Sequence, residues 1–322
     1  MFKYTGIDIS KETFDCCIDD GSKVQHVKLK NDFNGFEKLK NLLPPHAHVV
    51  MEASGPYYYC LAFFLYRNNI KVSVINPLVI RRFCQMRMTR TKTDKKDAVM
   101  IREYALMENP GEWTPDSPVI TQLKQLNGAI DLIEKNITAT SNQLSAFKQM
   151  PNADTQTLEQ METLLQITIN TKLKLEKQMD QVAKKHFNQT YKTLLTIPGI
   201  GPKAAVLLIA ITGNFEKFND YRQLVAYIGL NPNIFESGSS VKGKGHISKL
   251  GTARLRKVLY LCSWSAKRYN EQCKEMADRL KQKCKPNKVI NVAIASKLIR
   301  QAFAIGKSGQ EYQQNYQPKF AF

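Results

Sequence analysis

The chain has 322 residues, which is long enough for two domains with cores of their own, so a small fold stapled by disulfides is unnecessary. Its seven cysteines form no C-x-x-C pair, its start lacks the regions of a signal peptide and no apolar run approaches the roughly 20 residues that span a bilayer, so we expect a soluble cytoplasmic protein with reduced thiols and no membrane partner. The formal charge is +19, and residues 236–322 hold 18 basic and 5 acidic side chains, which favours a nucleic-acid partner over a merely solubilising surface.

The first part of the chain alternates short apolar runs with turns. Runs at 3–9, 13–19 and 23–29 are broken at Ser10-Lys11 and Asp20-Gly21, which predicts a three-stranded antiparallel meander. The elements expected after it are a helix at about 34–43, a strand over 47–53, a helix over 56–69, a strand over 71–76 and a helix over 94–107. This order is typical of the ribonuclease-H-like fold, but sugar kinases and actin-like ATPases share it, so the order alone does not decide the chemistry.

A periodic segment follows the proline-containing stretch EWTPDSP. Apolar positions step by three and four from Leu123 to Phe147 and again from Leu158 to Val182. Two helices of about four heptads each are predicted, joined by the turn PNADT into a hairpin whose seam is buried by the partner helix or by a second chain. An arm that pairs subunits and a spacer within one chain fit equally well. We therefore divide the chain into an α/β domain over 1–112, a coiled-coil hairpin over 113–186 and a mostly helical domain over 187–322.

Four acids stand out in the predicted α/β domain. Asp8 ends the first strand in GIDIS, Glu52 ends the fourth in MEASG, and Asp94 and Asp97 lie three apart at a helix start, where their side chains are about 5 to 6 Å apart. Each alone is commonly a turn or capping residue. Together they suit Mg²⁺, because phosphodiester cleavage with two metals needs oxygen ligands that hold the ions about 3.5 to 4 Å apart. The interleaved lysines are candidate phosphate contacts: Lys92, Lys95 and Lys96.

The helical domain opens with LLTIPGIGPKAAVLLIAI. Gly199 and Gly201 permit a tight turn, and the helix that follows presents its positive end, so the turn and the nearby Lys203 are candidates for binding a phosphate. The segment looks like the hairpin of helix-hairpin-helix DNA-binding motifs. An ordinary Gly-Pro turn between core helices is the alternative, and one turn can serve both purposes.

A glycine-punctuated loop comes next, in NPNIFESGSSVKGKGHISKLGTARLRKVLY. A serine among cationic groups is a candidate nucleophile on phosphorus, although Gly/Ser clusters are usually flexible loops. The serines are Ser237, Ser239 and Ser240, and the flanking candidates for nucleic-acid contacts are Lys242, Lys244, His246, Lys249, Arg254 and Arg256.

In this order the motifs GIDIS, MEASG, TKTDKKDA, IPGIG, ESGSSVKG and SKLGTARLRKVLY resemble those of the DEDD transposases of bacterial insertion sequences, which are related to the Piv-type DNA invertases. The resemblance implies a RuvC-like ribonuclease-H domain whose acids correspond to Asp8, Glu52, Asp94 and Asp97. It also implies that Ser237 becomes covalently linked to DNA, with Ser239 and Ser240 as alternatives. A noncoding bridge RNA, whose loops pair with donor and target DNA, is expected to choose the sites.

The hypothesis is therefore a recombinase in which bound Mg²⁺ positions the scissile phosphate and Ser237 displaces a 3′-hydroxyl, which lets strands rejoin without ATP. We expect a homodimer or homotetramer in the bacterial cytoplasm, associated with the nucleoid. Three rivals stay open: a RuvC-like structure-specific nuclease that uses water, a sugar-kinase or actin-like ATPase, and a nucleic-acid-binding protein without catalysis.

Overall fold

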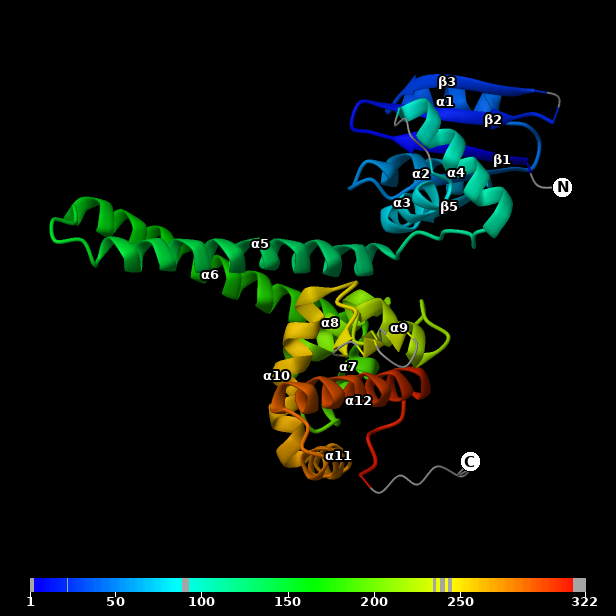
Figure 1. Ribbon diagram of the computed structural model, residues 1–322. Helices are drawn as coiled ribbons and strands as arrows, with labels where there is room; N and C mark the ends of the chain where they lie inside the picture. The colour runs from blue at the N-terminus through cyan, green and yellow to red at the C-terminus, as the bar shows by residue number, and fades with distance from the viewer. Residues whose placement is uncertain are drawn as a thin grey trace. The chain divides into compact units, whose positions relative to one another are not determined.

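The structure is a computed structural model that divides into two compact units, Met1–Pro115 and Asp116–Phe322 (Figure 1). We describe each unit by itself. The residues that the structure describes are 3–21, 23–88, 93–233, 236–237, 241–242 and 245–314.

The first unit is built on a five-stranded mixed sheet with the order β3-β2-β1-β4-β5. The pairs β1–β2 and β2–β3 are antiparallel, as the meander predicted, and β1–β4 and β4–β5 are parallel. This arrangement puts β1 at the centre of the sheet. The strands are β1 (Lys3–Ile9), β2 (Thr13–Asp19), β3 (Val24–Lys30), β4 (Ala47–Glu52) and β5 (Lys71–Ile75).

Helices cover both faces of this sheet. Alternation along β1 sends Ile7 and Ile9 into a core with α1 and α2, whereas Tyr4 joins a smaller core with α3 and α4. One helix, α3, was absent from the sequence prediction, although Asn76 caps it by accepting a hydrogen bond from the backbone of Leu78. The helices are α1 (Phe33–Leu42), α2 (Tyr58–Arg67), α3 (Pro77–Met86) and α4 (Asp94–Glu108).

The second unit is helical and begins with the predicted hairpin (Figure 1). Its long helices are α5 (Pro118–Phe147) and α6 (Thr155–His186), with Asp154 as the N-cap of α6. The base of the hairpin is part of the main core of this unit: Leu123 and Ile130 of α5 and Ala183 of α6 are buried there with the C-terminal helices. Hairpin and C-terminal helices therefore share one core at this point.

Six further helices and two small antiparallel ribbons complete the described part of the second unit. The ribbons pair β6 (Pro232–Asn233) with β9 (His246–Ile247) and β7 (Glu236–Ser237) with β8 (Val241–Lys242). The helices are α7 (Asn188–Leu195), α8 (Pro202–Thr212), α9 (Tyr221–Ile228), α10 (Ala253–Tyr269), α11 (Glu271–Gln282) and α12 (Asn287–Ser308).

Helix α12 is long and apolar enough to cross a membrane by length and composition alone, in contrast to the expectation that no run approached that size. Its packing gives another reason for its apolar composition. Ile290, Ile294 and Leu298 are fully buried in the core of the second unit. A buried core helix passes the same length and composition test, so α12 is weak evidence for a membrane.

The feature of the first unit that places the acids is the close packing of α4 on β1. Gly6 and Asp8 lie on one face of β1, because they are two residues apart. A Cβ atom on Gly6 would lie 2.2 Å from the carbonyl oxygen of Ala98 and 2.6 Å from the backbone nitrogen of Arg102. Only glycine lets the α4 backbone approach the strand this closely.

We expect Gly6→Ala to destabilise the first unit by about 1–3 kcal/mol, because the added methyl group must push the α4 backbone away from β1. The variants are made in a Trp264→Phe background, so that Trp113, which lies in this unit, is the single tryptophan. Its fluorescence during urea unfolding measures the change in stability. Gly111→Ala is the matched control, since a Cβ atom there has no neighbour within 4 Å. Equal midpoints for the two alanine variants would contradict this account of the packing.

Candidate active site

Three elements of the first unit bring acids to the same end of the sheet. Asp8 is near the end of β1, and Glu52 ends β4, which runs parallel beside β1 with Ile7 opposite Met51. Asp94 and Asp97 occupy the first turn of α4, the helix that packs on β1. The positive end of a helix favours carboxylates at this position.

The electrostatics of Asp8 show that these acids act on one another. The pKa of Asp8 is raised from 3.8 to about 6, first by burial and then by the negative charges of Asp97, Asp94 and Glu52. Asp15 adds a smaller contribution of the same sign. All four predicted acids therefore share one electrostatic neighbourhood. Among the described residues, no three His, Cys, Asp or Glu side chains lie close enough to hold a metal ion as they stand.

A fifth acid and a lysine belong to this site and were missed by the sequence analysis. Asp15 lies opposite Asp8 across the β1–β2 pair, and Lys28 lies opposite Asp15 across the β2–β3 pair. The Lys28 ammonium is 3.3 Å from the carboxylate of Asp15 and 3.6 Å from that of Asp94. Lys28 thus supplies positive charge to both β2 and the start of α4. Pairing the three strands of the predicted meander in register is the signal that would have found both residues.

Two further contacts fix α4 on the sheet. Arg102 forms an ion pair with Asp19 of β2, and both side chains are largely buried. The hydroxyl of Tyr4 donates a hydrogen bond to the side chain of Asn109, the C-cap of α4. Helix α4 is therefore held at its middle and its end, while its acidic first turn stays near Asp8.

Two of the three lysines predicted to contact phosphate near these acids belong to the described part of α4. Lys95 and Lys96 are exposed at the start of α4, where the backbone nitrogen of Lys96 donates to the capping side chain of Thr93. Lys92 lies outside the described residues.

Ser237, the predicted nucleophile, lies in β7, where its Cα pairs with that of Val241 in β8. The structure describes the backbone of Ser237 and Lys242 in this ribbon but not their side chains. Ser239, Ser240 and Lys244 also lie outside the described residues.

The IPGIG turn packs against α10. Gly199 has φ +104°, and a Cβ atom there would lie 2.7 Å from the Cβ of Ala266. The backbone amide of Gly201 contacts the thiol of Cys262, whose pKa is raised by burial in spite of that contact. Gly199 thus serves the packing of the turn on α10, the alternative that the sequence had left open, whereas a Cβ atom on Gly201 would have no neighbour within 4 Å. A phosphate contact at this turn stays a prediction.

Three of the predicted DNA-contacting cations have partners inside the protein. The Arg254 guanidinium is almost fully buried and donates to Asp131 at 2.9 Å and to the carbonyl of Asn127 at 2.8 Å. Arg256 donates to the carbonyl of Ile228 at 2.6 Å. The Lys203 ammonium is 2.6 Å from Glu176, while Lys249 and His246 are exposed. Nucleic-acid binding by these residues stays a prediction.

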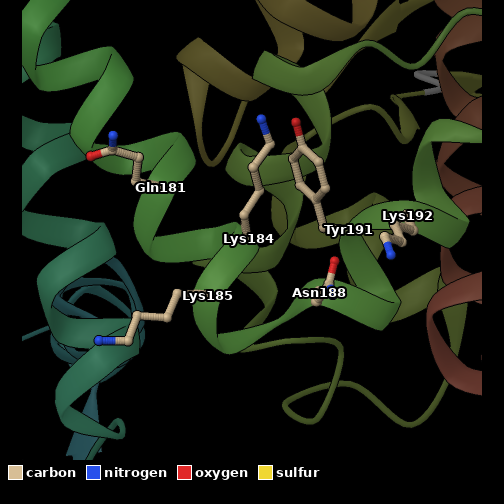
Figure 2. A pocket seen from close by; sticks show the side chains of 6 residues that line it. All are labelled: Gln181, Lys184, Lys185, Asn188, Tyr191 and Lys192. Atoms are coloured by element: carbon tan, nitrogen blue, oxygen red, sulfur yellow. The ribbon is translucent and has the colours of Figure 1, made fainter.

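A basic hollow of about 480 Å³ lies at the junction of α6 and α7. Lys184, at its centre, is 2.7 Å from Asp180, and the Tyr191 hydroxyl donates to the same carboxylate at 2.8 Å. Figure 2 shows Lys185 pointing away from Lys184. Because its ammonium groups do not converge, we interpret the hollow as a broad basic surface rather than a cage for one phosphate.

We predict that the raised pKa of Asp8 makes the contribution of this residue to the stability of the metal-free protein less favourable at neutral than at acid pH. A folded-state pKa of about 6 against 3.8 means that Asp8 favours folding while protonated, and that this contribution is lost as the pH rises through 6. In EDTA at about pH 8, Asp8→Asn should therefore raise the free energy of unfolding by about 1–2 kcal/mol, a figure discounted for partial exposure. Calorimetry should find that the gain shrinks to near zero at about pH 4. A gain that is constant with pH would refute the prediction.

Comparison with known families accounts for both units. A transposase model of the DEDD type found in IS110 elements matches residues 5–149. A second model, described as the transposase IS116/IS110/IS902 family, matches residues 191–278. Together the two matches cover more than half of the chain, and they include Asp8, Glu52, the acids of α4 and Ser237.

Relatives match along nearly the whole length. The chain is 28% identical to a pilin gene-inverting protein of Moraxella lacunata over 96% of this chain and 97% of that protein. It is 25% identical to the transposase for insertion sequence element IS1328 of Yersinia enterocolitica over 94% of this chain and 96% of the relative. It is 26% identical to the transposase for IS1111A of Coxiella burnetii over 80% and 76% of the two chains. The chain therefore belongs to the IS110 family of DEDD transposases, and it is a DNA transposase or recombinase.

Proposed function

We propose that the first unit is a RuvC-like ribonuclease-H domain that binds Mg²⁺ through Asp8, Glu52, Asp94 and Asp97. The observation that carries the proposal is that β1, β4 and the first turn of α4 bring these acids to one end of the sheet, where burial and then the charges of the other three acids raise the pKa of Asp8. Mutual repulsion of this kind is relieved when a cation binds, and carboxylate oxygens are the ligands that Mg²⁺ prefers. The charge and the ligand chemistry of these four acids therefore support a divalent ion, although their side chains would have to draw closer together to hold it.

When bound, magnesium would neutralise charge on the scissile phosphate and stabilise the leaving oxygen. The protein's own residues would do the rest. Asp8 and Glu52 sit on paired strands, which fix their backbones, and the Asp94/Asp97 pair is carried by a helix that Arg102 holds on the sheet. Rigid elements of this kind keep ligands in position. Lys28 would balance Asp15 and Asp94 before the ion arrives.

Ser237 is our proposed nucleophile. In this step a bond forms between the Ser237 oxygen and phosphorus, and the bond from phosphorus to the 3′-oxygen breaks. The serine proton leaves to a base, and the departing 3′-oxygen takes up a proton. The resulting phosphoserine ester keeps the energy of the phosphodiester, so strands can rejoin without ATP. All three serines lie within the second family match, and the ESG motif, in which the serine directly follows the acid, supports this assignment over Ser239 and Ser240.

We further propose that a noncoding bridge RNA directs the enzyme to donor and target DNA, and that the chain works as a homodimer or homotetramer in the cytoplasm at the nucleoid. The charge of +19 is compatible with two nucleic-acid partners. The three parts expected from the sequence, 1–112, 113–186 and 187–322, would then be the catalytic domain, the arm and the serine domain.

Mg²⁺ should stabilise the wild-type protein against unfolding and leave Asp8→Asn almost unchanged. At a concentration 100 times the Kd, one bound ion adds about 2.7 kcal/mol. Thermal unfolding in EDTA and in Mg²⁺, at equal ionic strength, measures the effect. Glu37→Gln, which removes a partly exposed acid of α1, is the control and should respond like wild type. If Asp8→Asn gains as much as wild type, the ion does not bind at these acids.

Incubation with a DNA substrate and its cognate RNA in Mg²⁺ tests the nucleophile. Wild type should give a protein–DNA adduct that survives denaturant, and Ser237→Ala should give none because the attacking oxygen is gone. Ser239→Ala and Ser240→Ala are matched controls that should retain the adduct. Cleavage without any adduct in wild type and Ser237→Ala alike would identify a nuclease that uses water.

A further inference from the structure

One face of α10 is exposed and combines apolar, aromatic and basic side chains. The opposite face packs into the core through Leu255, Leu259 and Ala266, all fully buried. On the exposed side, Leu261 is 60% and Trp264 50% accessible. Lys257, Leu261, Trp264 and Arg268 follow one another at spacings of four, three and four, so they lie along one stripe of the helix. We call these four residues, with the adjacent Lys267, the α10 stripe.

All charged side chains of α10 are positive. Its 17 residues include five arginines and lysines and no acid. Arg254 and Arg256, at the start of the helix, are bonded to other parts of the unit, whereas Lys257, Lys267 and Arg268 form no ion pair with any described residue. Their charge is available to a partner.

The tryptophan and a lysine of this stripe are already in contact. The Lys267 ammonium lies 4.4 Å from the centroid of the Trp264 ring, a cation–π distance. The lysine thereby holds positive charge directly beside an accessible aromatic surface. Exposure of a large aromatic ring costs free energy in water unless a partner covers it at some stage.

We infer that the α10 stripe binds an unpaired segment of DNA, with a base stacked on Trp264 and the strand's phosphates beside Lys257, Lys267 and Arg268. Aromatic rings that receive bases within a basic surface are the usual means of binding single strands. In a duplex the bases stack on one another, so their faces cannot reach the Trp264 ring. An apolar protein partner would offer no anion to Lys257, Lys267 and Arg268, which form no ion pair with any described residue. The choice of unpaired DNA as the ligand rests on the proposed function, because cutting and rejoining strands exposes unpaired DNA.

The protein has two tryptophans, Trp113 in the first unit and Trp264, so Trp113→Phe leaves Trp264 as the single fluorophore. A mixed-sequence DNA single strand titrated in EDTA, where metal-dependent cleavage cannot occur, should quench its fluorescence by base stacking. The same sequence as a duplex, and as RNA, should quench less. Equal quenching by the duplex, or stronger quenching by RNA, would overturn the assignment to unpaired DNA.

Affinity measured with a dye-labelled strand in the otherwise wild-type chain does not depend on the Trp113 substitution. Trp264→Leu keeps an apolar side chain but removes the ring, and it should weaken single-strand binding about tenfold, within the range expected for one stacked base. Trp264→Phe should retain most of the affinity, and duplex binding should change less than about twofold in both variants. Since Trp264 is exposed, neither substitution disturbs the core.

Unchanged single-strand affinity in Trp264→Leu would overturn the inference. That result would leave the proposed function intact, because Mg²⁺ binding by Asp8 and adduct formation by Ser237 are measured separately. If the protein neither binds Mg²⁺ at Asp8 nor forms an adduct at Ser237 but still binds single strands through Trp264, the proposed function is wrong and the inference about the α10 stripe stands.

Discussion

The close approach of α4 to β1 is the constraint on which the candidate active site depends. Without a side chain at Gly6, the α4 backbone comes near enough to the strand to set its first turn beside Asp8. The acids of α4 reach the electrostatic neighbourhood of Asp8 only because this contact is tight. The Arg102–Asp19 pair holds the helix in that place, so a residue with no side chain and an ion pair remote from the chemistry together position the acids.

The same closeness carries a cost in stability. Burial of the Asp8 carboxyl disfavours its charged form, the neighbouring carboxylates repel it, and the raised pKa of Asp8 expresses both effects. Lys28 and the positive end of α4 offset part of it, but Lys28 is half exposed and its effect is screened by solvent. A residual surplus of negative charge is what gives a site affinity for a divalent cation. Complete internal neutralisation would make the fold more stable and the site poorer at binding metal.

Sequence patterns predicted the features that depend on local spacing. The meander, β4, β5, α4 and the hairpin follow from period and turn chemistry, and the four acids follow from strand ends and a helix start. Features that depend on contacts between distant residues were missed. Strand register alone brings Lys28 beside Asp15, and the ion pair between Arg254 and Asp131 joins residues that are 123 positions apart in the chain. Helix α3 is different, since Asn76 and Pro77 formed a local start signal that was overlooked.

Net charge alone does not locate a nucleic-acid surface in this chain. Arg254 and Arg256 lie in the most basic region, yet one is buried against α5 and the other binds the end of α9, so both contribute to the packing of α10. Those bonds orient the helix so that its apolar side enters the core and Trp264 remains accessible. Cations of one helix thus divide into those that fix its orientation and those that its orientation presents to solvent. The second group can exchange counterions for phosphates without giving up a bond inside the protein.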